Sequence, residues 1–379
     1  VPHLRFPEFS GEWEKYRLCD VASIVGRIGF RGYTTNDIVT KGKGAIALSP
    51  TNIENNKLTY DKDNTYISFY KYEESPEIMI KQGDVIFVKT GSTVGKVAYV
   101  DKLICKTTLN PQVVVLKDIQ CDNYLLSVLM STNKFQNAIR KIIVGGAVPT
   151  LSQAAMGDIV VTMPQATEQE KLSKFISLLD DRIATQNKII EDLKILKSAI
   201  AERLFNSTDG DILSLSDVCI IQKGKQVNGE DLSETGKFYV MNGGVEPSGY
   251  YDQCNTPANT ISISEGGNSC GYIQYNRDAF WSGGHCYTLN NIQPNVCKLY
   301  LYHYLKSQES SIMKLRIGTG LPNIQKKDLE KFHILLTSKA IQESISAFLT
   351  TIDRKITNED MLLQRFQKGK QYLLRQMFI

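Results

Sequence analysis

The sequence predicts an α+β fold in which two globular domains, related by a pseudo-twofold axis, are joined by two long antiparallel helices that form a coiled coil. The first observation is an internal repeat: residues 145–205 align without a gap onto residues 318–378, with ten identical positions. The second is a helical spacing of apolar residues in two long stretches, and the third is a series of short strand-like runs separated by glycine-rich turns. A repeat of 173 residues is too long for a solenoid, so the chain contains two copies of one large unit.

Four segments follow from this pattern. Residues 1–164 and 207–337 are expected to form the globular domains, and residues 165–206 and 338–379 the spacer helices. In each globular domain a strand runs into a glycine-rich turn and further strands, after which come a helix, a second glycine-rich turn and a final strand. The expected strands are 84–89, 96–100, 112–116, 158–163, 260–264 and 272–275, and the expected helices are 123–140 and 298–314.

Both spacer helices place apolar residues at alternating spacings of four and three, as a helix with one buried stripe does. The expected coiled-coil core consists of Ile176, Leu179, Ile183, Ile190, Leu193, Ile200, Leu349, Ile352, Ile356, Leu363, Phe366 and Leu373. Polar residues interrupt the series at the same two places, Gln186 and Lys197 in the first helix and Glu359 and Lys370 in the second. Coiled coils use such interruptions to fix register. Two unrelated amphipathic helices on separate cores remain the alternative.

The link between the first helix and the second domain decides the direction of pairing. Only residues 206–210 separate the helix from the strand-like segment that begins the second domain. The second domain therefore follows the end of the first helix, and the second helix leaves that domain. If the two helices pair, they must run antiparallel.

Charge and cysteine content limit the function classes. The net charge is +4, with +3 in residues 1–164 and −2 in residues 207–337, which is low for a protein that binds nucleic acid alone. Partner chains would then supply part of the charge that neutralises phosphates. Cys254, Cys270, Cys286 and His285 lack the tight ligand pair of most zinc sites, so reduced thiols are expected. With no apolar run of about 18 residues, we expect a cytoplasmic protein.

Motifs that suggest catalysis are incomplete. Residues 91–97 resemble a phosphate-binding loop, but the loop is one residue short and lacks the Ser or Thr after Lys96. Residues 110–113 approach the Asn-Pro-Pro-aromatic motif of amino-methyltransferases without its second proline or its aromatic residue. The sequence therefore predicts a non-catalytic chain that holds no cofactor or metal of its own. A cryptic enzyme is the disfavoured alternative.

Several segments together resemble the specificity subunits of type I restriction-modification systems. The opening residues 4–9 with Trp13 and the segment 18–21 are similar to the start of those subunits. So are the Gly-x-x-x-Pro turns at 145–151 and 318–324, and the Gln-Glu pairs that begin both helices at Gln169 and Gln342. The similarity covers nearly the whole chain. Lys171, Ser344 and Ile341 depart from the pattern.

The resemblance implies two target recognition domains, each reading half of a bipartite, asymmetric site in double-stranded DNA, with the paired helices setting the spacing. It implies two methyltransferase (M) subunits docked on the helices, with restriction and translocase (R) subunits joining them. S-adenosylmethionine, ATP and Mg are then expected on those partners, which methylate adenine N6 or cut DNA. No membrane is involved. A duplicated scaffold that binds only proteins is the alternative.

Side chains that can contact DNA are expected in loops at strand ends. Glycine lets these loops approach a groove closely, and Ser, Thr, Asn and Lys side chains reach phosphates or base edges. The expected DNA contacts are Arg27, Arg31, Lys43, Thr51, Asn52, Lys89, Ser92, Thr93, Lys96, Lys223, Lys225, Asn242, Asn268, Ser269 and His285.

Overall fold

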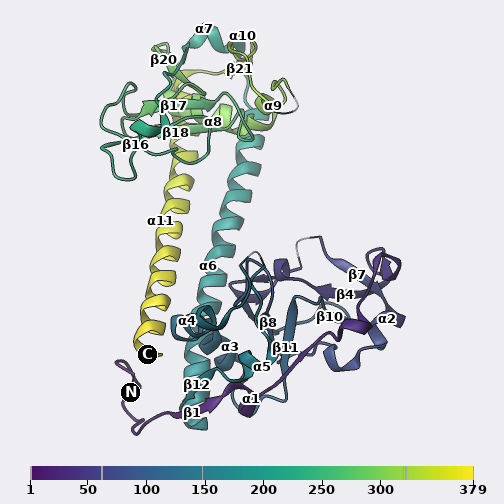
Figure 1. Ribbon diagram of the computed structural model, residues 1–379. Helices are drawn as coiled ribbons and strands as arrows, with labels where there is room; N and C mark the ends of the chain where they lie inside the picture. The colour runs from purple at the N-terminus through teal and green to yellow at the C-terminus, as the bar shows by residue number, and fades with distance from the viewer. Residues whose placement is uncertain (1, 61–62, 147, 319, 321, 379) are drawn as a thin grey trace. The chain divides into compact units, whose positions relative to one another are not determined.

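The protein is described by a computed structural model that covers residues 2–60, 63–146, 148–318, 320 and 322–378. The chain divides into two compact units (Figure 1). Unit 1 comprises Val1–Thr185 and Gln364–Ile379, and unit 2 comprises Gln186–Leu363. Each unit therefore contains one globular domain and part of each long helix. The four-segment division expected from the sequence stays a prediction.

The main sheet of unit 1 has six strands in the order β2-β11-β8-β9-β6-β5. Their bounds are β2 Ser23–Gly26, β5 Ile53–Glu54, β6 Asn56–Leu58, β8 Val85–Val88, β9 Val97–Tyr99 and β11 Val113–Lys117. The pairs are antiparallel except β6 with β9. All of β8 is buried, because the strand lies in the middle of the sheet between two apolar clusters. This buried strand ends at the first glycine-rich turn.

A second sheet in unit 1 has the order β10-β4-β7-β3. It consists of β3 Ile38–Val39, β4 Gly44–Leu48, β7 Thr65–Ser68 and β10 Thr107–Leu109, and β4 pairs with β10 in parallel. Separately, β1 Glu14–Arg17 pairs with β12 Val160–Met163. The short helices of unit 1 are α1 Leu18–Val21, α2 Phe69–Glu73 and α5 Gln153–Gly157, with 3-10 turns at Gly29–Arg31, Thr35–Asp37, Pro50–Asn52 and Pro76–Ile78.

The helix predicted at 123–140 is divided in two, α3 Asn123–Ser131 and α4 Asn133–Ile142. Thr132 interrupts it because its backbone is extended and its hydroxyl donates to the Leu129 carbonyl oxygen at 2.6 Å. The helix predicted at 298–314 is also divided, into α8 Lys298–Ser307 and α9 Glu309–Met313. The break lies at the equivalent place in both units, so it belongs to the shared fold.

Unit 2 repeats the arrangement of unit 1. Its main sheet has the order β14-β20-β17-β18, which corresponds to β2-β11-β8-β9. A three-stranded sheet, β16-β15-β19, again contains one parallel pair, β15 with β19. The strands are β13 Asp211–Ser214, β14 Ile220–Lys223, β15 Phe238–Met241, β16 Tyr250–Tyr251, β17 Thr260–Ser264, β18 Ile273–Asn276, β19 Trp281–Ser282, β20 Cys286–Asn290 and β21 His333–Leu336. The remaining short helices are α7 Leu215–Val218 and α10 Lys326–Glu330, with a 3-10 turn at Gly229–Asp231.

The long helices α6 Ala166–Asn206 and α11 Lys339–Met377 pack against each other within each unit. In unit 1 the Lys370 ammonium donates to Asp180, and in unit 2 the Lys197 ammonium donates to Asp353. These two pairs are equivalents of each other under the 173-residue repeat. In unit 2 the Gln186 amide also donates to Glu359, its own repeat equivalent, at 2.5 Å. Only antiparallel helices can make these contacts, which confirms the predicted direction of pairing.

The apolar stripe predicted for the two helices lies on their packed faces. Ile176, Ile190, Leu349 and Ile356 are buried, and the other eight predicted core residues are half-buried. Gln186 is buried as well, in register with these apolar positions. At the end of α6, Phe205 packs edge-on against Tyr300 and Tyr304.

One glutamine fastens the start of each long helix to its globular domain. Gln169 accepts from the Asp122 backbone N–H at 2.9 Å and donates to the Pro164 carbonyl oxygen. Gln342 does the same with the Cys297 N–H and the Thr337 carbonyl oxygen. These contacts explain why the Gln of the Gln-Glu pair recurs in both copies.

The departure from the repeat at Ile341 also has a physical reason. Its counterpart Glu168 is fully buried and forms an ion pair with Arg5 at 2.6 Å. Arg5 lies in the segment that precedes β1, which has no counterpart ahead of β13 because α6 ends only a few residues earlier. A carboxylate at 341 would have no such partner, and Ile341 is largely exposed.

Candidate nucleic-acid interface

The two glycine-rich turns adopt one backbone conformation. In unit 1 the turn joins β8 to β9, and Gly91 and Gly95 have φ of +106° and +99°. In unit 2 it joins β17 to β18, and Gly267 and Gly271 have φ of +77° and +91°. Positive φ favours glycine at all four places. At Gly271 a Cβ would also lie 3.1 Å from the Met313 Cα, so space restricts this position as well.

A second loop is hydrogen-bonded to each of these turns. It follows α4 in unit 1 and α9 in unit 2, and contains the Gly-x-x-x-Pro sequences, of which residues 147, 319 and 321 lie outside the described part of the chain. The Gly91 N–H donates to the Pro149 carbonyl oxygen at 2.9 Å, and the Gly267 N–H donates to that of Pro322 at 3.0 Å. Isolated bridges join Thr90 to Thr150 and, in the other unit, Gly266 to Asn323. Both units therefore hold two loops together with the same contacts.

In each unit one more residue is hydrogen-bonded to the strand end at which the glycine-rich turn begins. It lies just before β11 in unit 1 and just before β20 in unit 2. The Lys89 N–H donates to the Gln112 carbonyl oxygen at 2.9 Å, and the Glu265 N–H donates to that of His285 at the same distance. Gln112 precedes β11 and His285 precedes β20, so the two residues are structural equivalents. We call Gln112 and His285, with Lys89 and Glu265 beside them, the matched positions. The backbone is the same in both units, whereas the side chains differ in charge and hydrogen-bonding character.

In unit 1 the glycine-rich turn borders an open cavity of about 620 Å³. Ser92, Thr93 and Lys96 line it from the turn. Asn55, between β5 and β6, and Asn56, the first residue of β6, line it from the other side. Both asparagines have positive φ, a conformation that Asn tolerates better than most residues. Hydroxyl, amide and ammonium groups thus line one cavity, as expected of a surface that contacts the polar edges of DNA bases.

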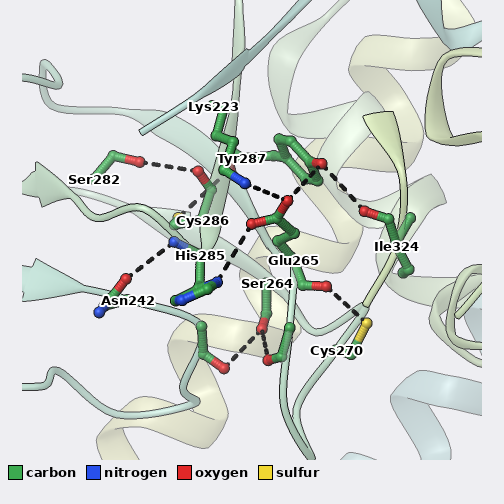
Figure 2. Close-up of polar contacts among 12 residues, drawn as sticks. Lys223, Asn242, Ser264, Glu265, Cys270, Ser282, His285, Cys286, Tyr287 and Ile324 are labelled. Carbon is green, nitrogen blue, oxygen red and sulfur yellow. Dashed lines mark hydrogen bonds and ion pairs between the residues drawn. The ribbon is translucent and has the colours of Figure 1, made fainter. Parts of the chain in front are cut away.

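In unit 2 the same region holds a buried carboxylate (Figure 2). The Glu265 side chain is only 11% exposed and lies between Lys223 and His285. Its Oε1 accepts from the Lys223 ammonium at 2.6 Å and from the Tyr287 hydroxyl at 3.0 Å. Burial, together with this hydrogen bond, raises the pKa of Tyr287. The tyrosine hydroxyl also lies 3.1 Å from the Ile324 carbonyl oxygen, so its single proton is shared between the two acceptors.

The other oxygen of Glu265 has a different environment. Oε2 is buried and has no hydrogen bond from the described residues, and the imidazole Nδ1 of His285 lies 3.5 Å away. The His285 backbone N–H donates to the Asn242 side-chain oxygen at 3.0 Å. A side chain at Gly243 would meet the His285 Cβ at 3.1 Å. The histidine is thus held closely on the backbone side, while its ring is 62% exposed.

The residues predicted to contact DNA in unit 1 lie either at the cavity or near the second sheet. Ser92, Thr93 and Lys96 line the cavity, and Lys89 lies beside them. Lys43 and Thr51 are exposed next to the second sheet, and Arg31 lies 3.4 Å from Glu77.

Two predicted contacts in unit 1 are occupied inside the protein. Arg27 is 7% exposed, and its guanidinium donates to the Leu109 carbonyl oxygen at 2.9 Å and to Thr108 at 3.1 Å. Burial lowers the pKa of this arginine. Asn52 is also buried and accepts from the Ser49 backbone N–H at the start of a 3-10 turn. Both side chains already have partners inside the protein, and their contact with DNA stays a prediction.

In unit 2 the predicted residues lie closer together. Asn242 contacts His285, Lys223 contacts Glu265, and Asn268 and Ser269 lie on the glycine-rich turn. Lys225 is exposed, and its backbone N–H donates to the Ser282 carbonyl oxygen.

Sequence reasoning did not select Gln112, Glu265, Asn55 or Asn56. Gln112 and His285 are 173 residues apart, so extending the gap-free repeat toward the N-terminus would have paired them. Glu265 gave no such signal, because an isolated Glu after a strand is more often an ordinary surface residue. Its burial results from contacts with strands far away in sequence.

The described residues contain no group of three or more His, Cys, Asp or Glu side chains placed to hold a metal ion. All eight cysteines are unpaired. Cys286 is buried, which raises the pKa of its thiol to about 11, and Cys270 donates to the Glu265 carbonyl oxygen. None of the helices in the described part of the chain is both long and apolar enough to cross a bilayer.

Each unit thus carries the same α+β frame with polar loops at the ends of its central strands, as in a duplicated recognition protein. The family model for the type I restriction modification DNA specificity domain matches residues 10–194 and 209–365. The two matches cover most of the chain, which therefore belongs to this family.

Individual relatives agree with this assignment. A protein of Mycoplasma genitalium that carries the name of a type I specificity subunit is 35% identical over 160 residues, which is 42% of each chain. This chain therefore aligns with less than half of that relative's length. A type I restriction enzyme specificity subunit of Methanocaldococcus jannaschii is 24% identical over 254 residues, 62% of this chain and 54% of the relative.

Solved structures share the fold over the full length. The crystal structure of the S subunit of a type I restriction-modification system from M. genitalium has a TM-score of 0.65 at 18% identity, covering 100% of this chain and 99% of that one. A chain from a structural study of type I complex assembly and conformational transition has a TM-score of 0.55 at 17% identity, covering 98% of both chains. The predicted fold class is confirmed.

Proposed function

We propose that this chain is the DNA-recognising subunit of a type I restriction-modification complex and reads a bipartite, asymmetric site. The proposal rests on the two loop frames, one in each unit, in which the glycine-rich turn is hydrogen-bonded to the loop with the Gly-x-x-x-Pro sequence. Both frames are built from the same backbone hydrogen bonds, yet they carry different side chains at the matched positions. Two such frames would present different donor and acceptor patterns to two half-sites, as the reading of unlike base sequences requires.

The chemistry of the loops supports contact with base edges. Tight glycine turns let the backbone approach a groove, and Asn, Ser, Thr, Gln and His side chains both donate and accept hydrogen bonds. The net charges of the globular segments, +3 and −2, are small for this task. Partner subunits therefore contribute much of the positive charge that binds phosphates.

The remaining roles belong to partners. Two methyltransferase subunits dock on α6 and α11, and restriction subunits join them in the cytoplasm. Those partners bind S-adenosylmethionine, ATP and Mg, and they methylate adenine N6 or cut the DNA. This chain performs no catalytic step. Its helices set the distance between the half-sites, since α6 and α11 both run through unit 1 and unit 2.

The test is to purify the complex with its cognate methyltransferase, footprint it on DNA, and map methylated adenines in a host genome. We expect two protected patches separated by an unprotected gap, with affinity that falls steeply as salt increases. A single continuous protected site would refute the two-part reading. A complex that forms without selecting any DNA sequence would support the protein scaffold instead.

A further inference from the structure

The histidine at the matched position of unit 2 has its ring oriented by a buried charge. Glu265 Oε2 is an acceptor removed from water, and leaving such an acceptor unsatisfied is costly. Nδ1 of His285 lies 3.5 Å from this oxygen and can donate to it. The favourable tautomer of His285 therefore carries its proton on Nδ1, directed at the carboxylate.

The charge of Glu265 does not require a second positive group. Lys223 already donates to Oε1 at 2.6 Å, so the carboxylate is neutralised from the other side. A neutral imidazole with its proton on Nδ1 satisfies Oε2 without adding charge. Its second nitrogen, Nε2, is then a hydrogen-bond acceptor on a side chain that is 62% exposed.

Acceptors of this kind recognise amino groups. In the major groove only adenine N6 and cytosine N4 offer amino donors, whereas guanine and thymine offer carbonyl oxygens in that place. We propose that His285 is a specificity-determining residue of unit 2, whose Nε2 accepts a hydrogen bond from the exocyclic amino group of adenine or cytosine. Glu265 is its positioning residue.

Unit 1 has another chemistry at the equivalent place. Gln112 is exposed, and its side-chain amide makes no hydrogen bond within the described residues. Lys89 replaces Glu265 beside it. Since no carboxylate orients Gln112, the amide can offer either its donor or its acceptor. The amino-group preference is therefore specific to unit 2 and to one of the two half-sites.

The inference rests on the proposed function, and one experiment separates the two. The chain is expressed with its methyltransferase partner in a host that lacks other adenine methylation, and methylated sites are mapped across the genome. A wild-type complex that yields no two-part motif refutes the proposed function. A wild-type motif that His285→Phe leaves unchanged refutes only the role of His285.

His285→Phe keeps a ring in the same place but removes the acceptor. We expect discrimination at one position of one half-site to fall about three- to tenfold, the effect of one lost hydrogen bond. The bases of the other half-site and the gap stay the same, which also shows that the complex has assembled. His285→Gln returns an acceptor near the position of Nε2, and it should recover the preference.

Glu265→Gln tests the positioning role. Its amide can turn its NH₂ group toward the imidazole, so Nδ1 can become the acceptor and Nε2 the donor. We expect the same half-site position to lose its preference for an amino group, and to gain acceptance of guanine or thymine. Loss at a different position, or loss of all methylation with a folded chain, would overturn the assignment.

Two matched controls complete the design. His333→Asn changes the exposed histidine of β21, which lies away from the loops, and should leave the motif unchanged. Gln112→Ala should leave every base of the half-site read by unit 2 unchanged. A change there after Gln112→Ala would contradict independent reading by the two units.

Discussion

At the residue scale, glycines with positive φ hold the loop frame in shape. Gly271 combines a φ of +91° with a Cβ position 2.9 Å from the Met313 side chain and 3.1 Å from its Cα. An alanine there would be strained in its backbone and would also displace α9. The frame therefore depends on this glycine for two separate reasons.

We predict that Gly271→Ala lowers the free energy of unfolding of unit 2 by about 1–3 kcal/mol, which urea denaturation can measure. Gly229→Ala is the matched control, because a Cβ at Gly229 meets nothing within 4 Å. The control should change stability by less than about 0.5 kcal/mol. Equal effects of the two substitutions would show that the turn is not strained by a side chain.

Another residue-scale property is the buried histidine of α8. His303 is 2% exposed, and its Nε2 lies 3.0 Å from the Thr350 hydroxyl. Burial lowers its pKa from 6.5 to about 4; nearby Lys197 adds to the shift and Asp353 opposes it. The folded protein therefore resists a proton that the unfolded chain accepts.

We predict a loss of stability as the pH falls from about 6.5 toward 4, with a slope of up to about 1.4 kcal/mol per pH unit from His303. Above pH 6.5 the full stability is present, because the His303 imidazole is neutral in both the folded and the unfolded protein. Urea unfolding of wild type and His303→Gln at several pH values measures it. The variant should lose less stability on acidification, and parallel pH profiles would contradict the prediction.

At the scale of elements, the two long helices carry a duplicated ion pair. The 173-residue repeat aligns Lys197 with Lys370 and Asp180 with Asp353, so the two ion pairs are equivalent. All four side chains are between 15% and 25% exposed. Each pair lies inside one unit. The Lys–Asp contact itself is the same in both units, although Asp180 also accepts from the Tyr124 hydroxyl at 2.6 Å and Asp353 lies 3.9 Å from the His303 imidazole. The pairwise coupling between Lys and Asp should therefore be similar in the two units.

We predict that double-mutant cycles for the two pairs, each with Lys→Met and Asp→Asn, give coupling energies of about 1 kcal/mol that agree within about 0.5 kcal/mol. Chemical denaturation at low and at 1 M salt supplies the values. Because the pairs are partly buried, salt should weaken them only in part. Couplings that differ widely between the units would show that the helices pack differently at the two places.

The long helices were also the elements that the sequence described best. A stripe of apolar residues over about ten turns, with polar residues at Gln186 and Lys197, is a strong local signal. The strands of the second sheets, such as β4 and β7, were not predicted. Their pairing joins residues about 20 positions apart through an irregular segment, and β4 also pairs in parallel with the distant β10. Such contacts leave no periodic trace in sequence.

The candidate site was predictable only in part, for a related reason. Glycine marked the turns, because positive φ restricts which residues fit there. The direction of a side chain was not readable: Arg27, which the sequence predicted to contact DNA, is buried and donates to the Leu109 carbonyl oxygen. The Glu265 cluster depends on Lys223, Tyr287 and His285, which arrive from three different segments. Only the folded sheet brings them together.

At the scale of the whole molecule, the proposed spacing role can be tested by lengthening the helices. Seven residues inserted after Thr185 in α6, with seven inserted after Glu359 in α11, keep the heptad register. They add roughly 10 Å of helix. We predict that the gap between the half-sites changes while the bases of both half-sites remain the same, as mapped by adenine methylation. Altered half-site bases with an unchanged gap would contradict the role of the helices.

The two glutamines that begin the long helices have a mechanical consequence. Gln169 joins the first turn of α6 to the backbone at the start of α3, and α3 packs on β9, the strand that leaves the glycine-rich turn. The first turn of α6 is therefore fixed to its globular domain and cannot rotate independently of it. If a partner docks on the helix as proposed, torque on α6 would reach α3, β9 and the glycine-rich turn through the Gln169 contacts and the Arg5–Glu168 ion pair.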